Sequence, residues 1–143
     1  MVLEAAKTAR MRLVLLSGWA GLKPGMLSQD VIALSGVPHS WLYPRCKAVV
    51  HHGGAGTCAA ALRSGVPQAI VWHLGDQKTW GKLMKLRGVA PPAIFHRQFS
   101  SAWLADTVSR LSDGALRSAA RRLSDEISRE DGVGQAVEAI QRL

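Results

Sequence analysis

The sequence has only two cysteines, few aromatic residues other than tryptophan, and no long hydrophobic run. Cys46 and Cys58 are too few for a disulfide framework or a zinc site, so we expect both to be packing residues in a reducing compartment. The apolar runs fall far short of the roughly 18 residues of a membrane-spanning helix. Residues 1–7 lack the basic start and apolar centre of a signal peptide, so a cytoplasmic location is expected.

Acidic residues are scarce in the first hundred positions, which carry 12 basic residues against three acids, whereas the last 43 carry six against seven. This excess suits an anionic ligand such as a nucleotide, or peripheral contact with an anionic membrane surface. The basic residues are scattered, and neither an RNA-binding signature nor a Cys/His finger occurs. We therefore expect no nucleic acid among the partners.

A length of 143 residues corresponds to one domain. Short apolar runs alternate with amphipathic stretches, which predicts an α/β fold with an open parallel sheet flanked by helices. Strands are expected at 12–17 (buried on both faces), 31–34, 47–52 and 68–72, with at best an edge strand in 89–94. Helices are expected at 2–9, 56–63, 80–86 (with Leu83, Met84 and Leu86 facing the core) and in three C-terminal segments that serve only to pack.

The segment HHGGAGT at 51–57 joins the strand at 47–52 to the helix that follows it. Glycines let the backbone approach a ligand closely, and the free N–H groups at a helix start attract an anion. His52 and Thr57 would add side-chain donors. The glycine spacing is not that of the dinucleotide fingerprint, and no lysine follows the last glycine as in a Walker loop. Alone, such a segment is more often only a tight strand-to-helix connection in an α/β domain.

Ligands of open parallel sheets bind beyond the carboxyl ends of the strands. Three segments are expected at that edge, namely Ser17-Gly18-Trp19, the loop at 52–57, and Asp76-Gln77. Their expected convergence favours a ligand site over a simple connection.

Several motifs together resemble the C-terminal half of GT-B glycosyltransferases: PHSWLYPRC at 38–46, HHGGAGT at 51–57, GVP at 65–67, and GDQ at 75–77 followed by Trp80-Gly81. The resemblance covers nearly the whole chain and extends to sterol 3-beta-glucosyltransferases and to bacterial enzymes that glycosylate antibiotics. It implies a Rossmann-like domain that binds a UDP-sugar, UDP-glucose above all. The parent reaction would transfer a hexose to a sterol or a similar lipophilic hydroxyl.

The resemblance assigns donor-binding roles to Val37, His39, His52, Ala55, Gly56, Thr57, Asp76 and Gln77, with Ser17, Gly18, Trp19 and Gly54 as secondary candidates. His52 and the loop amides would contact the diphosphate, and the first two residues would line the base pocket. Asp76 and Gln77 would hold hexose hydroxyls, because a carboxylate accepts hydrogen bonds and an amide both donates and accepts them. Neither a metal nor another cofactor is implied, since His52, the amides and the helix dipole would neutralise the leaving diphosphate.

The chain departs from the family pattern at Gly36, where plant members of the superfamily have a tryptophan that stacks on uracil. The identity of the base is therefore implied by the family alone, and Trp41 is expected in the core. In the family, the acceptor pocket and the general base, a histidine supported by an aspartate, belong to an N-terminal half that these 143 residues do not contain. We expect residues 1–143 to be a single, partial donor-binding domain without a catalytic residue of its own, inactive alone and reaching its sterol through that half.

The same resemblance implies that the first strand of the C-terminal half, which lies in the middle of the sheet, is missing from this chain. The sheet would then open a gap, close in a new order, or borrow a strand from elsewhere.

Three other functions are compatible with parts of the sequence: a hydrolase, a metal site and a non-catalytic module. His-Gly-Gly also resembles the oxyanion loop of lipase-like hydrolases, but no G-x-S-x-G nucleophile motif occurs. His51 and His52 are neighbours in a strand and point to opposite faces, so they do not share a metal ion. A non-catalytic nucleotide-binding remnant or interaction module stays open.

Overall fold

The structure is a computed structural model that describes residues 2–17 and 23–143. No helix in these two ranges is both long and apolar enough to cross a membrane. In chain order the elements are α1 (Val2–Thr8), β1 (Leu13–Leu16), β2 (Gly25–Ser28), β3 (Val31–Leu34), α2 (His39–Leu42), η1 (Tyr43–Arg45), β4 (Val49–His51), α3 (Ala55–Arg63), β5 (Gln68–Trp72), α4 (Gln77–Leu86), β6 (Ile94–Phe95), η2 (His96–Gln98), α5 (Ser101–Leu111), α6 (Gly114–Ile127) and α7 (Gly132–Gln141).

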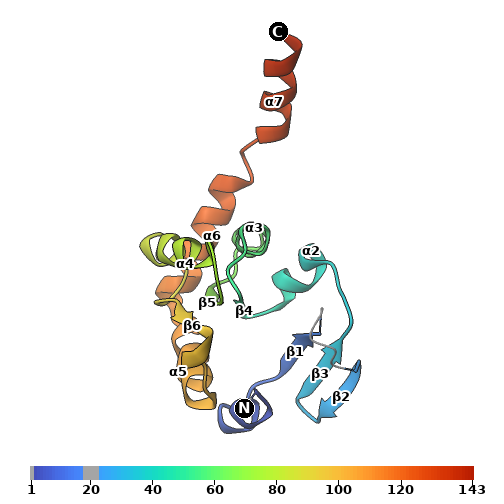
Figure 1. Cartoon of the computed structure of the whole chain (residues 1–143), viewed down its shortest axis with the longest axis vertical. Helices are drawn as coiled ribbons and strands as arrows, with labels where there is room; N and C mark the ends of the chain where they lie inside the picture. The colour runs from blue at the N-terminus through green and yellow to red at the C-terminus, as the bar shows by residue number, and fades with distance from the viewer. Residues whose placement is uncertain (1, 18–22) are drawn as a thin grey trace.

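The strands form two three-stranded sheets, with the orders β1-β3-β2 and β4-β5-β6. β1 runs parallel to β3, and β5 runs parallel to both of its neighbours. β2 pairs antiparallel with β3 and is a strand that the sequence did not predict, because Pro24-Gly25 reads as a loop. The predicted fold class, parallel strands flanked by helices, is confirmed. The two sheets are separate, and the division between them lies between β1 and β4 (Figure 1).

The two sheets are connected through helices and side chains. α1, which precedes β1, packs against α5, which follows β6 (Figure 1). At the far end of β1, Leu16 packs against a buried cluster made of Leu42, Tyr43, Val49, Ala61 and Val66. The two halves therefore share packing contacts even though β1 and β4 belong to different sheets.

β1 is less buried than expected. The apolar run at 12–17 predicted a strand buried on both faces, but Val14 is 41% exposed. The reason is that β1 is paired with β3 on one side and ends its sheet on the other. Residues of an edge strand keep more of their surface in solvent than residues of a central strand.

A second cluster fills the space between β5 and the helices α3, α4 and α6; it consists of Cys58, Ile70, Met84, Val89, Ala90 and Ala120. α4 begins at Gln77, three residues before the predicted start. Its buried residues are Gly81 and Met84, whereas Leu83 and Leu86 are 36% and 82% exposed. The prediction that both leucines face the core is wrong. Gly81 determines the inward face, because a Cβ there would lie 2.5 Å from the Cβ of Ala93.

Trp41 was expected in the core, and this is also wrong, because the side chain is 53% exposed. α2 is a single turn, and the two residues after Trp41, Leu42 and Tyr43, are the ones that enter the core. The guanidinium of Arg45 lies over the indole, 4.5 Å from its centroid, and donates a hydrogen bond to the Trp41 carbonyl.

The C-terminal helices differ in how they pack. α5 is capped by Ser100, whose hydroxyl accepts a hydrogen bond from the Trp103 amide at 3.1 Å, and α5 and α6 both bury residues. α7 has no buried residue, contrary to its predicted packing role. Its apolar residues Val133, Val137 and Ile140 are exposed, and the helix extends away from the sheets (Figure 1).

Candidate functional site

The two histidines at the end of β4 have different surroundings. His51 is half-buried: its Nδ1 accepts a hydrogen bond from the Gly53 amide at 3.0 Å, and its Nε2 lies 2.8 Å from Oε1 of Gln68. Because a backbone N–H only donates, the imidazole proton is on Nε2 and is donated to Gln68. Burial lowers the pKa of His51 to about 4, helped by the nearby His52 and His39 and opposed by the hydrogen bond to Gln68. His51 is thus a neutral residue whose two hydrogen bonds connect the loop to Gln68 of β5.

His52 is exposed and lies against the glycines of the loop. A Cβ on Gly54 would lie 2.5 Å from Nε2 of His52, so the imidazole occupies the space that a side chain at 54 would need. Gly53 has a φ of +89°, and a Cβ there would meet Ile70 at 2.7 Å and the Gln77 carbonyl at 3.1 Å. The absence of side chains at these two glycines therefore leaves room for the imidazole of His52 near the start of α3 and lets the loop approach β5 and α4.

The first turn of α3 offers free donors. Gly54 is its N-cap and makes no side-chain cap, and the first hydrogen bond of the helix runs from the Cys58 amide to the Gly54 carbonyl at 2.9 Å. The amides of residues 55–57 precede that bond and have no partner within the helix. Ala55 and Gly56 are exposed, Thr57 is half-buried, and a Cβ at Gly56 would face open space. The positive end of the helix dipole adds to the attraction for an anion here.

The turn after β5 presents the second group of polar residues. Oδ2 of Asp76 accepts a hydrogen bond from Nε1 of Trp80 at 2.9 Å. Oε1 of Gln77 accepts from the His73 and Leu74 amides at 2.8 and 3.2 Å, which folds the turn. The Gln77 oxygen is therefore used within the protein, and its NH₂ group is the part that is left for a ligand. Asp76 keeps its second carboxylate oxygen as an acceptor.

The loops after β4 and β5 lie side by side. Gly53 approaches the backbone of Gln77, as its Cβ contact distance shows. Burial, together with the charge of Asp76, raises the pKa of the Cys58 thiol to about 11. His52, the start of α3 and Asp76-Gln77 thus form one candidate site at the carboxyl ends of two adjacent strands.

Other predicted residues lie around this site or outside the described ranges. His39 stacks on Tyr43 with ring centroids 4.5 Å apart, and Val37 packs against the same cluster. Ser17 is buried and donates its amide to the Leu34 carbonyl at 2.9 Å, while Gly18 and Trp19 lie outside the described residues. His73 is exposed and stacks on His96.

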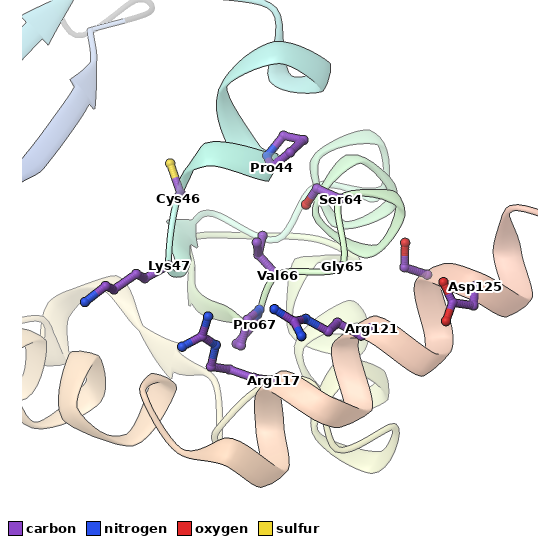
Figure 2. A pocket seen from close by; sticks show the side chains of 11 residues that line it. Pro44, Cys46, Lys47, Ser64, Gly65, Val66, Pro67, Arg117, Arg121 and Asp125 are labelled. Atoms are coloured by element: carbon purple, nitrogen blue, oxygen red, sulfur yellow. The ribbon is translucent and has the colours of Figure 1, made fainter.

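A separate basic pocket of about 300 Å³ opens at the opposite edge (Figure 2). Lys47 and Pro67 precede β4 and β5, so the pocket lies at the amino ends of these strands. Arg117 and Arg121 of α6 point into it beside Ser64, which caps the C-terminal end of α3. A helix C-terminus favours nearby cations. The two arginines of this pocket therefore lie away from the candidate site and have a local structural explanation.

Sequence reasoning did not assign roles to His51, Gly53 and Gln68, although they hold the loop in place. A polar Gln68 at the start of an apolar strand was the available signal, because a buried amide needs a partner. It is fully buried in the structure, and its NH₂ group contacts the sulfur of Met84 at 3.4 Å.

Residues 17–141 match a family described as "Erythromycin biosynthesis protein CIII-like, C-terminal domain". The chain belongs to this family. The domain is 43% identical over 140 residues to sterol 3-beta-glucosyltransferase UGT80A2 of Arabidopsis thaliana, covering 97% of the chain and 22% of that relative. It is 39% identical over 133 residues to O-mycaminosyltylonolide 6-deoxyallosyltransferase of Streptomyces fradiae, covering 92% of the chain and 31% of that relative. This EryCIII-like domain therefore spans about a fifth to a third of the length of these enzymes.

Solved glycosyltransferases share the fold of this EryCIII-like domain. The glycosyltransferase of kitacinnamycin superposes with a TM-score of 0.87 at 25% identity, over 99% of this chain and 37% of that one. Glycosyltransferase VinC in complex with dTDP gives a TM-score of 0.79 at 29% identity, over the whole of this chain and 38% of that one. The expected likeness to the C-terminal half of a GT-B glycosyltransferase is confirmed.

Proposed function

We propose that this EryCIII-like domain binds UDP-glucose as the donor half of a hexosyltransferase that acts on a sterol or a similar lipophilic hydroxyl. The observation that carries the proposal is the site itself: unpaired amides at the start of α3, the imidazole of His52 beside them, and Asp76-Gln77 on the next turn. Similarity to the Arabidopsis sterol glucosyltransferase supports the choice of acceptor and sugar. The dTDP in VinC supports a nucleoside diphosphate ligand.

The diphosphate would sit against the first turn of α3, where the amides of residues 55–57 and the Thr57 hydroxyl donate to its oxygens. His52 adds a further donor from the side of the loop. When the bond between the sugar and the diphosphate breaks, the electron pair moves to the leaving phosphate oxygen, and these donors stabilise the charge that develops there. The site residues therefore contribute most as the leaving group departs.

The hexose would face Asp76 and Gln77. The free carboxylate oxygen of Asp76 accepts from one sugar hydroxyl, and the NH₂ group of Gln77 donates to another. Val37 and His39 would border the nucleobase. The acceptor, and the base that takes its proton, would come from a further part of the complete enzyme, so the domain alone would bind donor without transferring sugar.

Titration calorimetry with UDP and UDP-glucose on the unmodified chain and three variants tests this proposal. His52→Ala is expected to weaken both ligands by about 10- to 100-fold, because a donor to a charged group is worth roughly 1.5–3 kcal/mol. Asp76→Asn is expected to weaken UDP-glucose while sparing UDP, because only the sugar contacts that carboxylate. Glu138→Gln on exposed α7 serves as the control and leaves both affinities unchanged.

Equal loss of UDP and UDP-glucose on Asp76→Asn would remove that residue from the sugar site. A folded chain that binds neither UDP nor dTDP would favour a non-catalytic remnant or interaction module instead. Tighter binding of dTDP than of UDP would mean that the donor carries thymine instead of uracil, and the assignment of the diphosphate site would stand.

A further inference from the structure

The basic pocket at the amino ends of β4 and β5 forms where α6 packs on the turn that ends α3 (Figure 2). At this turn Gly65 has a φ of +65°, and a Cβ there would lie 3.4 Å from Cβ of Ser124 and 3.7 Å from Cα of Arg121. The Ser124 hydroxyl also donates a hydrogen bond to the Arg63 carbonyl at 2.9 Å. A positive φ and a close neighbour both favour glycine at this position. The contact fixes the part of α6 from which the arginines project into the pocket.

The positive charge of the pocket is not balanced within it. Three cationic side chains and one carboxylate line it, namely Lys47, Arg117, Arg121 and Asp125. The ion pairs of residues 2–17 and 23–143 lie elsewhere, on α5 and at the end of α7. Arg121 and Asp125 have the same spacing as those pairs, but Asp125 projects on the far side of Arg121 (Figure 2). Arg117 and Arg121, four residues apart on one helix, repel each other. An anion would balance the excess of two positive charges.

The end of α3 leaves the donors of these arginines available. Its last carbonyls already accept hydrogen bonds within the turn: that of Ala61 from the Ser64 hydroxyl at 2.6 Å, and that of Leu62 from the Gly65 amide at 3.1 Å. The helix dipole favours positive charge in this corner, but it does not occupy the guanidinium N–H groups. A guanidinium presents its N–H donors in a planar fork that matches two oxygens of a phosphate.

The two arginines also border a second hollow. It has a volume of about 330 Å³ and is lined by Gly114 and Ser118 at the start of α6, together with Arg117 and Arg121. The positive end of the α6 dipole lies here, so the attraction for an anion continues beyond the first pocket. A ligand held by its charged group at the arginine pair can therefore extend into this hollow or toward Val66 in the first one.

We propose that the basic pocket binds a phosphate monoester, with the forks of Arg117 and Arg121 on its oxygens and Lys47 as a third cation. A phosphate monoester carries about two negative charges at neutral pH, which matches the charge excess of the pocket. A carboxylate or a phosphodiester carries a single charge. The monoester can belong to a phosphorylated compound in solution or to the headgroup of a membrane lipid, since both present the same group. The inference does not depend on the donor site, because no residue of this pocket is assigned to the donor.

Titration of the full chain with inorganic phosphate, followed by NMR, tests the pocket. The amides of Gly65 and Val66 and the Nε–H signals of Arg117 and Arg121 should shift together, with a dissociation constant of about 1 mM or tighter. Acetate, with one charge, should bind about tenfold more weakly. UDP should instead shift the amides of residues 55–57. A failure of the donor site and a failure of this pocket are therefore distinguishable.

Substitutions on α6 show whether the arginine pair holds the phosphate. Arg121→Gln removes one charged fork and should weaken phosphate binding about tenfold. Arg121→Lys, which keeps the charge and loses the fork, should have an intermediate affinity. Arg122→Gln is the matched control: it removes the same charge from the next position, outside the pocket, and should change the affinity by less than about twofold. Without phosphate, the unfolding midpoint of Arg121→Gln should be unchanged or slightly raised, because repulsion from Arg117 is relieved.

Sedimentation with phosphatidylcholine vesicles separates the two sources of the phosphate. Binding to vesicles that contain phosphatidic acid, a monoester, but not to vesicles with the same proportion of phosphatidylglycerol, a diester, would assign the group to a lipid. Binding of free phosphate without such a preference would assign it to a soluble compound. Three results would overturn the proposal. The first is a folded chain that binds neither phosphate nor phosphatidic acid. The second is phosphate-induced shifts confined to residues 55–57. The third is an equal loss of affinity in Arg121→Gln and Arg122→Gln, which would mean a diffuse attraction between a basic chain and any anion.

Discussion

At the residue scale, the two adjacent histidines show how one step along a strand changes chemistry. His51 is turned inward and fixed as a neutral ring between Gly53 and Gln68, whereas His52 is exposed beside the start of α3. The alternation of strand side chains predicted that they face opposite ways. The direction of each ring could not be predicted, because it depends on Gln68, which lies 17 residues later in the sequence.

His51 makes the stability of the fold dependent on pH. Its pKa is lowered from 6.5 to about 4, so between these values the unfolded chain binds a proton that the folded chain does not. The contribution of His51 is fully present above pH 6.5 and is lost as the pH falls toward 4, by up to about 3 kcal/mol. Urea unfolding across this range is the measurement. His51→Asn, which keeps an acceptor for the Gly53 amide but does not titrate, should show a shallower decline.

His52→Asn is the control for that experiment, because the exposed ring makes no hydrogen bond to the loop backbone. Because the charge of His52 is a lesser cause of the lowered His51 pKa, the decline of His52→Asn with pH should stay closer to that of the unmodified chain than the decline of His51→Asn. A decline that stays equally steep in His51→Asn would mean that other groups cause it.

The glycines of the loop have separable roles. Gly53→Ala should lower the free energy of unfolding by about 1–3 kcal/mol, because a Cβ at positive φ would also meet Ile70 at 2.7 Å. In Gly54→Ala the nearest atoms to the new Cβ belong to the imidazole of His52, which can rotate away, so stability should change little while UDP affinity falls. Gly56→Ala faces open space and should leave stability equal or slightly raised. Thermal unfolding and UDP titration on the three variants separate these effects.

At the element scale, most helices and strands could be predicted from local patterns. The helix expected at 56–63 corresponds to α3, and the strands expected at 31–34 and 68–72 correspond to β3 and β5. The prediction of the inward face of α4 was wrong because it relied on the leucines, whereas the close approach of Gly81 to Ala93 determines which face is buried. β2 was missed because Pro24-Gly25 reads as a loop, although β2 is joined to β3 by residues 29–30 alone and pairs antiparallel with it. In α4, tertiary packing overrides the local preference.

The corrected face of α4 can be checked by two truncations. Met84→Ala removes a side chain that is only 2% exposed in the cluster with Ile70 and Val89, and should cost about 2–5 kcal/mol. Leu86→Ala truncates a side chain that is 82% exposed and should change stability by less than about 0.5 kcal/mol. Urea denaturation gives both values. A larger loss of stability for Leu86→Ala than for Met84→Ala would show that Leu86 faces the core, as the sequence suggested.

At the scale of the whole molecule, the order of the strands depends on contacts between distant segments. Runs of Val, Ile and Leu predicted the strands, and the segments that follow β4 and β5 predicted the shared edge where His52 and Asp76 lie. The division between β1 and β4 was anticipated only through the resemblance to a longer fold. The exposure of Val133, Val137 and Ile140 on α7 is a further feature that a helical pattern cannot predict, because the pattern shows an apolar face but not its partner.

The two sheets should differ in local stability. β5 is paired on both sides and Ile70 is 1% exposed, whereas β2 is exposed along its length and β1 has one free edge. Amide exchange in increasing urea should therefore open residues 25–34 at a lower free energy than Ala69 and Ile70. A single free energy common to all strands would contradict this and would mean that the contact of α1 with α5 and the packing of Leu16 make the halves one cooperative unit.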